Sequence, residues 1–192
     1  MKTLLLDIGG IFFYPAWRLQ GIPEISKRLH IKTSDFKKAL DKYKKPFYTG
    51  KMSETEYWES VLEKVDLQTI DSLELKKLYR SYILPIPKTL DLLSILSTKF
   101  TLVSCNNSPK EWMDYRIKMY SLDKYFTKFF TSGYMGYMKP ENKMYLTILE
   151  SYKNEDLLYI DDNKDYISIA QEKYKIHGKT YHSYKDLLQL VR

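Results

Sequence analysis

Short apolar runs of β-forming residues alternate with amphipathic helical patterns along most of this chain, and this alternation limits the fold more than any other feature. The apolar runs cover residues 3–6, 100–104, 128–131, 157–160 and 180–182. The helical patterns between and after the later runs cover about 109–119, 141–152, 164–175 and 184–191. Strands that alternate with helices pair in parallel, and a parallel sheet is covered on both faces. The sequence therefore predicts an α/β fold with a Rossmann-like, doubly wound parallel sheet.

Residues 14–87 break the alternation because their apolar residues follow only a helical spacing, as in Phe36, Leu40 and Tyr43. Prolines stand near both ends of this segment and favour short, stiff connectors. We therefore expect an α/β core domain formed by residues 1–13 and 88–192, with an inserted α-helical cap formed by residues 14–87.

Polar residues stand where the predicted strands end. Asp7 follows the first run and precedes Gly9 and Gly10, whose missing side chains let backbone amides approach an anion. Ser104 ends the second run, before a helix that we expect to be capped by Ser108 with a proline as its first residue. Taken alone, an aspartate before glycines is more often a turn, and such a serine is more often a cap.

A lysine and an acidic pair complete the set of candidate residues. Lys139 precedes Pro140, which we expect to start a helix, so Lys139 itself lies outside that helix. Asp161 and Asp162 follow the run 157–160, and adjacent carboxylates at a buried strand end repel each other unless a cation lies between them. Phosphoryl transfer needs an oxygen nucleophile, positive charge against the phosphate oxygens and usually Mg²⁺ held by carboxylates, and the strand ends supply residues for each.

Four segments in this order resemble the sequence motifs of the haloacid dehalogenase-like (HAD) superfamily. They are LLLDIGGI at residues 4–11, LVS at 102–104, GYMKP at 136–140 and YIDDN at 159–163. The helical insertion after the first motif is similar to the small α-helical (C1) cap of subfamily I, and the Asp-x-Gly pattern is similar to that of sugar-phosphate phosphatases.

The resemblance implies a role for each matching residue. Asp7 would be the nucleophile that becomes an aspartyl phosphate, and Lys139 would neutralise charge on the phosphate and the nucleophile. Phosphate would be bound by Gly9, Gly10, Ser104, Cys105 and Lys139, and Mg²⁺ by Asp7, the Gly9 carbonyl oxygen, Asp161 and Asp162. Gly50-Lys51-Met52-Ser53 resembles the cap turn that faces the active site, and candidate substrate contacts are Trp17, Arg18, Tyr48 and Lys51.

The sequence departs from the family pattern at Gly9, where the phosphatases usually carry the aspartate that acts as general acid and base. Such a group contributes about 10² to 10⁴-fold to the rate. We therefore expect a Mg²⁺-dependent phosphatase that prefers phosphorylated metabolites with good leaving groups. The alternatives are a catalytically weak or silent protein that binds a metabolite or a protein partner and, less favoured, a dehalogenase or a phosphotransferase.

Composition restricts the partners and the location that we expect. The net charge is +7, but the clustered lysines at positions 37, 38, 42, 44 and 45 accompany no nucleic-acid motif and are interpreted as a solvated helix face. No apolar run reaches the ~20 residues of a membrane span. With a single cysteine and no signal-peptide pattern, we expect a cytoplasmic protein that binds a small phosphorylated metabolite and neither nucleic acid nor membrane; the sequence leaves the oligomeric state open.

Overall fold

The computed structural model describes residues 2–15, 21–153 and 156–191. Its centre is one five-stranded sheet in the order β3-β2-β1-β4-β5, and every pair of neighbouring strands is parallel. The strands are β1 (Thr3–Leu6), β2 (Thr101–Asn106), β3 (Phe126–Thr131), β4 (Leu157–Asp161) and β5 (His177–Thr180). The predicted α/β fold with a Rossmann-like parallel sheet is confirmed.

The strand register brings the candidate residues to one edge of the sheet. Leu6 is paired with Ser104 of β2 and with Ile160 of β4. Because parallel strands keep their register, the next residues, Asp7, Cys105 and Asp161, lie side by side. This edge carries the carboxyl ends of the strands, where ligands bind in open α/β sheets.

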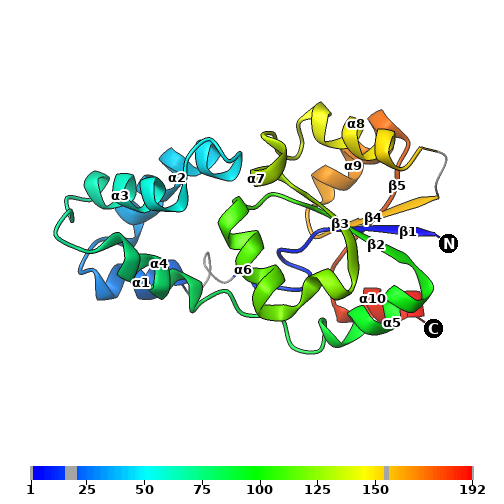
Figure 1. Cartoon of the computed structure of the whole chain (residues 1–192), viewed down its shortest axis with the longest axis horizontal. Helices are drawn as coiled ribbons and strands as arrows, with labels where there is room; N and C mark the ends of the chain where they lie inside the picture. The colour runs from blue at the N-terminus through cyan, green and yellow to red at the C-terminus, as the bar shows by residue number, and fades with distance from the viewer. Residues whose placement is uncertain (1, 16–20, 154–155, 192) are drawn as a thin grey trace.

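Helices cover both faces of the sheet (Figure 1). Leu5, Val103 and Tyr159 face α8 (Asn142–Ser151) and α9 (Lys164–Tyr174), while Leu4, Leu6 and Leu102 share the opposite core with α5 (Asp91–Lys99), α6 (Lys110–Tyr120) and α10 (Tyr184–Val191). The strands alternate between the two cores, as the two-residue period of side chains in a strand requires. Two short elements, η2 (Leu122–Lys124) and α7 (Ser132–Met135), flank β3.

The segment between β1 and α5 forms a separate helical body beside the strand ends (Figure 1). It contains α1 (Ile22–Arg28), α2 (Thr33–Tyr48), α3 (Glu54–Lys64) and α4 (Ser72–Arg80). Its entrance and exit run together, because Phe13 forms a bridge with Pro85 and Tyr14 N donates to the Leu84 carbonyl at 3.1 Å. The helices agree with the expected cap, and its limits at residues 14 and 87 stay a prediction.

The cap rests on α6 of the core through aromatic rings and one carboxylate. Tyr79 of α4 stacks on Trp112 with 4.2 Å between ring centroids. Glu54, at the start of α3, accepts a hydrogen bond from Trp112 Nε1 at 2.8 Å. Gly50, at φ 68°, lies so close to Gly133 that a Cβ would fall 2.4 Å from the Gly133 carbonyl oxygen. The cap and core therefore meet over a tightly packed surface.

Local predictions were wrong at four places. The second strand ends at Asn106 instead of Ser104, because Cys105 and Asn106 continue the pairing with β3 and Thr131 Oγ1 donates to Asn106 Oδ1 at 2.9 Å. Ser108 does not cap α6, whose N-cap is Pro109 and has no side-chain hydrogen bond. Pro140 does not start a helix, because α8 begins two residues later, at Asn142, with Glu141 as its N-cap.

The last strand is also displaced from the predicted residues 180–182. A glycine at position 178 argues against a strand interior. In the structure Gly178 permits close packing, because a Cβ there would lie 2.9 Å from Ile167 Cγ2 of α9.

Candidate active site

Asp7 lies directly after β1 at the carboxyl edge of the sheet. Its amide donates to the Ile160 carbonyl at 2.9 Å, which fixes the backbone against β4. The residue is 8% exposed. One carboxylate oxygen, Oδ1, accepts a hydrogen bond from Lys139, and no described residue donates to the other, Oδ2. Asp7 thus keeps one oxygen available to a ligand.

Lys139 comes from the loop between α7 and α8 and is positioned by Asn107. The Lys139 amide donates to Asn107 Oδ1 at 2.7 Å, and Asn107 Nδ2 donates back to the Lys139 carbonyl at 2.9 Å. This two-way contact holds the backbone, so the side chain is directed from a fixed point. Asn107 was not among the predicted site residues, and its neighbour in sequence, Asn106, gives no signal that separates the two.

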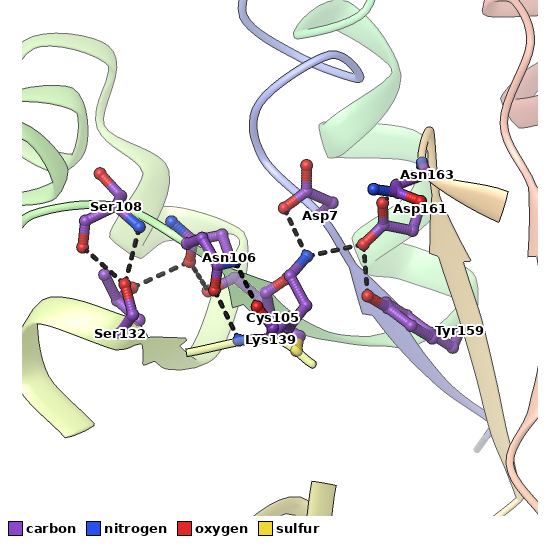
Figure 2. A network of polar contacts seen from close by, with 12 residues as sticks. Asp7, Cys105, Asn106, Ser108, Ser132, Lys139, Tyr159, Asp161 and Asn163 are labelled. Atoms are coloured by element: carbon purple, nitrogen blue, oxygen red, sulfur yellow. Dashed lines mark hydrogen bonds and ion pairs between the residues drawn. The ribbon is translucent and has the colours of Figure 1, made fainter. Parts of the chain in front are cut away.

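The Lys139 ammonium group lies between two aspartates (Figure 2). Its Nζ donates to Asp7 Oδ1 at 2.9 Å, to Asp161 Oδ2 at 2.6 Å and to the Cys105 carbonyl at 2.7 Å. An ammonium group has three donors, and all three are used. Burial disfavours the charge on Lys139, but Asp161 and Asp7 outweigh that effect and raise its pKa well above the ordinary value. Lys139 is therefore a fixed positive charge.

Asp161 and Asp162 lie in different surroundings. Asp161 is 1% exposed, accepts from the Asn163 amide at 2.8 Å and also from the Tyr159 hydroxyl. Asp162 is exposed at the pocket and packs over Gly10, where a Cβ would lie 2.1 Å from Asp162 Oδ2. Gly10, at φ 79°, therefore leaves the space that the Asp162 carboxylate occupies.

The carboxylates at the strand ends outnumber the cations in direct contact with them. Asp7, Asp161 and Asp162 each offer an oxygen within 4.8 Å of the others, and a single lysine lies among them. Burial, with help from Asp161 and Asp162, raises the pKa of Asp7 to about 7 although Lys139 opposes the rise. Burial and Asp161 also raise the pKa of Asp162. A cation among the three carboxylates would remove this repulsion, so the donor set fits a divalent metal ion.

The residues of the second strand are arranged differently from the expectation. Ser104 is fully buried, and its hydroxyl donates to Asn106 Oδ1 at 3.3 Å. Cys105 is also buried; burial raises the pKa of its thiol to about 12, which excludes a thiolate nucleophile at neutral pH. Neither side chain lines the pocket, which is bounded on this side by Asn106, Asn107 and Ser108.

A pocket of about 260 Å³ opens above Asp7 between the core and the cap. Gly9 lines it, as do Asp161, Asp162 and Lys139. The Gly10 amide donates to the Phe13 carbonyl at 2.8 Å and is not free for an anion. The remaining wall is formed by Tyr14, Pro15, Lys44, Tyr48, Trp112, Arg116, Met138, Asn163 and Tyr166.

The cap residues expected to contact substrate are only partly brought together. Tyr48 lines the pocket, whereas Lys51 is exposed and lies outside its lining. Trp17 and Arg18 lie outside the described residues. Lys44 and Arg116 line the pocket without having been predicted. Arg116 stands four residues after Trp112 in the same helix. Residues four apart lie on the same helix face, so Arg116 could have been predicted at the pocket if Trp112 had been assigned to it.

The whole chain resembles solved structures of HAD family enzymes. The HAD family enzyme bt-2542 from Bacteroides thetaiotaomicron matches with a TM-score of 0.83 at 21% identity, covering 100% of this chain and 98% of that one. The putative HAD-hydrolase YfnB from Bacillus subtilis, bound to magnesium, matches with a TM-score of 0.68 at 18% identity, covering 99% and 98%.

L-2-haloacid dehalogenase from Xanthobacter autotrophicus, with chloropropionic acid covalently bound, matches with a TM-score of 0.62 at 14% identity, covering 98% of this chain and 81% of that one. No family model and no curated protein matches the sequence. The chain therefore has the fold of these HAD enzymes. Among the described residues, no helix is long and apolar enough to cross a membrane.

Proposed function

We propose that this protein is a Mg²⁺-dependent phosphomonoester hydrolase that acts on a small phosphorylated metabolite through an aspartyl phosphate on Asp7. One observation carries the proposal. The Asp7 carboxylate is held by Lys139 through one oxygen, presents the other to a pocket, and belongs to a cluster of three carboxylates that a single lysine does not neutralise. Nucleophile, fixed cation and metal ligands are thus assembled at one strand edge, as phosphoryl transfer requires.

The chain's own residues support two displacement steps. Oδ2 of Asp7 attacks phosphorus, the bond from phosphorus to the ester oxygen breaks, and the departing oxygen takes a proton from water. A water molecule then attacks the phosphorus of the aspartyl phosphate, which releases inorganic phosphate and restores the Asp7 carboxylate. Lys139, fixed 2.9 Å from Asp7 Oδ1, keeps the nucleophile oriented and offsets negative charge that approaches with the substrate.

Mg²⁺ would be held by Asp7, Asp161, Asp162 and the Gly9 carbonyl oxygen. When bound, it supplies positive charge against the phosphate oxygens. Asp161 is already oriented by Tyr159 and Asn163, so it can serve as a ligand without rearrangement. The HAD family enzyme bt-2542 was crystallised with magnesium and inorganic phosphate, which supports the same use of this fold here.

Phosphate would lie against Asn106 and Asn107, before the N-terminus of α6, instead of against the Ser104 hydroxyl. Both asparagines line the pocket, while Ser104 is buried behind Asn106. Backbone amides at a helix start favour anions. Ser104 and Cys105 then act indirectly. Ser104 donates a hydrogen bond to Asn106, and the Cys105 carbonyl accepts one from Lys139 and orients it.

Gly9 leaves no carboxylic acid beside the leaving group. We therefore expect rates to depend steeply on leaving-group pKa, so that anomeric sugar phosphates, acyl phosphates and aryl phosphates react faster than alkyl phosphates. A plot of log rate against leaving-group pKa measures this dependence, and a flat plot would contradict it.

The test is release of phosphate from p-nitrophenyl phosphate and a panel of metabolite phosphates, with and without Mg²⁺, by the wild type and Asp7→Asn. Asp35→Asn, at an exposed site of the cap, removes the same charge elsewhere. Mg²⁺-dependent turnover that only Asp7→Asn abolishes supports the proposal. No turnover by folded, Mg²⁺-loaded protein favours a silent metabolite-binding protein, and metal-independent release of halide from a 2-haloacid favours a dehalogenase.

A further inference from the structure

Arg116 lines the same pocket as Asp7 and forms no salt bridge among the described residues; the carboxylate that acts on it electrostatically is the more distant Asp7. Its Nη1 donates to Ser108 Oγ at 3.0 Å, and its guanidinium carbon lies 5.5 Å from the centre of the Phe13 ring. Its Nε is buried and has no hydrogen-bond partner. Arginine has five N–H donors, and the structure uses one of them for a hydrogen bond.

An arginine without a counterion in such surroundings is costly, because burial removes water from a charge that cannot be lost near neutral pH. Arg80 shows the contrasting case: it is also partly buried, and its Nη2 lies 2.6 Å from Glu54 Oε2. The fold thus places a carboxylate in direct contact with one arginine of the cap and core interface, whereas the other has only the more distant charge of Asp7 beside the pocket. An anionic ligand would neutralise the charge of Arg116 and accept hydrogen bonds from its unused donors.

The guanidinium is also held in place before any ligand arrives. Ser108, which accepts its hydrogen bond, is itself fixed, because the Ser108 amide donates to Ser132 Oγ at 3.0 Å and the Ser108 carbonyl accepts from the Gly133 amide at 3.0 Å. The face of Phe13 supports the guanidinium plane. A fixed guanidinium plane is suited to bind carboxylate or phosphate through two parallel hydrogen bonds.

A ligand with two anionic groups could place its phosphoester and its second anion at different parts of this pocket. The ester phosphate belongs beside Asp7, Lys139 and the three carboxylates, at the floor of the pocket. Arg116 comes from α6 and shares its wall with Trp112 and with Tyr48 of the cap. In a pocket of about 260 Å³, a small molecule can reach both.

We propose that Arg116 binds a second anionic group of the substrate, a carboxylate or a second phosphate. This inference rests on the proposed function and narrows it: the substrate is a small metabolite with a phosphoester at one end and another anion at the other. Arg116 is then a specificity residue, since its contact selects a compound with two anionic groups over an otherwise equal phosphoester that lacks the second group.

Binding to Asp7→Asn with Mg²⁺, measured by calorimetry, tests this without turnover. The matched probes are 3-phosphoglycerate against glycerol 3-phosphate and 2-phosphoglycolate against ethyl phosphate; fructose 1,6-bisphosphate against fructose 6-phosphate tests a phosphate as the second anion. We expect the compound with the second anion to bind roughly 10- to 100-fold more tightly, the worth of charge-assisted hydrogen bonds. Arg116→Met should reduce that ratio to near one.

Lys118→Met is the control, because Lys118 is exposed on the same helix and carries the same charge. It should keep the ratio. Arg116→Met should melt no lower than the parent, since it removes an unpaired charge, and Arg116→Lys should recover part of the discrimination. Equal binding within every pair, failure of all probes to bind, or a ratio unchanged by Arg116→Met would overturn the inference.

Kinetics of the wild-type enzyme distinguish failure of the Arg116 inference from failure of the proposed phosphatase function. Hydrolysis that is equally fast with and without the second anion would remove the role of Arg116 and leave the phosphatase in place. Discriminating binding without any hydrolysis would remove the phosphatase and leave the anion site.

Discussion

Two sets of carboxylates in this molecule are neutralised to different extents. Glu54, 1% exposed where the cap meets α6, is paired with Arg80 at 2.6 Å and Lys76 at 3.0 Å, and its other oxygen accepts from Trp112. The cluster of Asp7, Asp161 and Asp162 shares the single cation of Lys139. The Glu54 carboxylate thus contacts two cations, whereas the three aspartates of the cluster share one.

The difference separates a structural charge from a functional one. A buried ion pair with all partners present fixes how two bodies meet, and removing one partner leaves an uncompensated charge. A cluster with excess charge weakens the metal-free fold and gains stability when a cation binds. We therefore expect substitutions at Glu54 to change stability, and substitutions at Asp7 to change activity and the response to Mg²⁺.

The largest expected effect is the loss of turnover in Asp7→Asn, about 10³-fold or more, because an amide is not a nucleophile toward phosphorus. Glu54→Gln should keep a kcat close to that of wild type when measured well below its melting temperature. Both variants are assayed with p-nitrophenyl phosphate at saturating Mg²⁺. Comparable losses in the two variants would contradict the separation of the two carboxylate sets.

Glu54→Gln should lose about 3 kcal/mol of unfolding free energy, because Arg80 and Lys76 keep their charges without the carboxylate between them. Urea unfolding measures the change. Glu59→Gln, on an exposed position of the same helix, is the matched control and should stay within about 0.5 kcal/mol of wild type. An equally small loss in both would show that the Glu54 pairs contribute little.

Gly9→Asp should add the missing acid and base. A Cβ at Gly9 would lie 3.8 Å from Asp7 Oδ2, an ordinary contact, and Gly9 is not among the residues of positive φ, so the side chain can be accommodated. We expect kcat for an alkyl phosphate to rise about 10²-fold. The rate for p-nitrophenyl phosphate should rise much less, since its leaving group needs no proton. Gly9→Asn has the same shape without the acid, and an equal gain in that variant would disprove the explanation.

The fold was predictable from sequence because each buried strand carries its own signal. Thr3–Leu6 is predicted at its observed bounds, because a short apolar run of three leucines before an aspartate is typical of a buried strand. The signal failed at two strands. Gly178 weakens the strand pattern of β5, although its missing side chain leaves room for Ile167. Cys105 and Asn106 extend β2 by pairing with β3, although they lie beyond the apolar run that predicts the strand.

The site was predictable as far as the sheet places it. Register alone brings Asp7 and Asp161 together, so strand-end residues could be expected to meet. Contacts between loops and helices could not be derived in the same way. Asn107 positions Lys139 across 32 residues of sequence, and Arg116 reaches the pocket only because α6 packs under the cap.

The smallest expected effect, and the sharpest test of the charge imbalance, is a reversal of stability between wild type and Asp7→Asn. Burial raises the pKa of Asp7 to about 7 in the folded, metal-free protein, against 3.8 for the ordinary group. Between those values the folded protein retains a proton that the unfolded chain has lost, so the contribution of Asp7 to stability falls as pH rises. Without Mg²⁺, Asp7→Asn should thus match wild type near pH 4 and melt several degrees higher at pH 8, since ~1 kcal/mol shifts the melting temperature of a chain of this size by roughly 2–4 °C.

Mg²⁺ should reverse this order. A cation that needs Asp7 as a ligand binds the folded wild type and stabilises it by mass action, while the variant has lost one ligand. Thermal melts at pH 4 and pH 8, with EDTA and with saturating Mg²⁺, measure all four states. Asp35→Asn, exposed on the cap, controls for the loss of one charge and should show neither effect. A variant that melts below wild type in EDTA at pH 8 would mean that Lys139 compensates Asp7 fully, and the distinction drawn between Glu54 and Asp7 would fail.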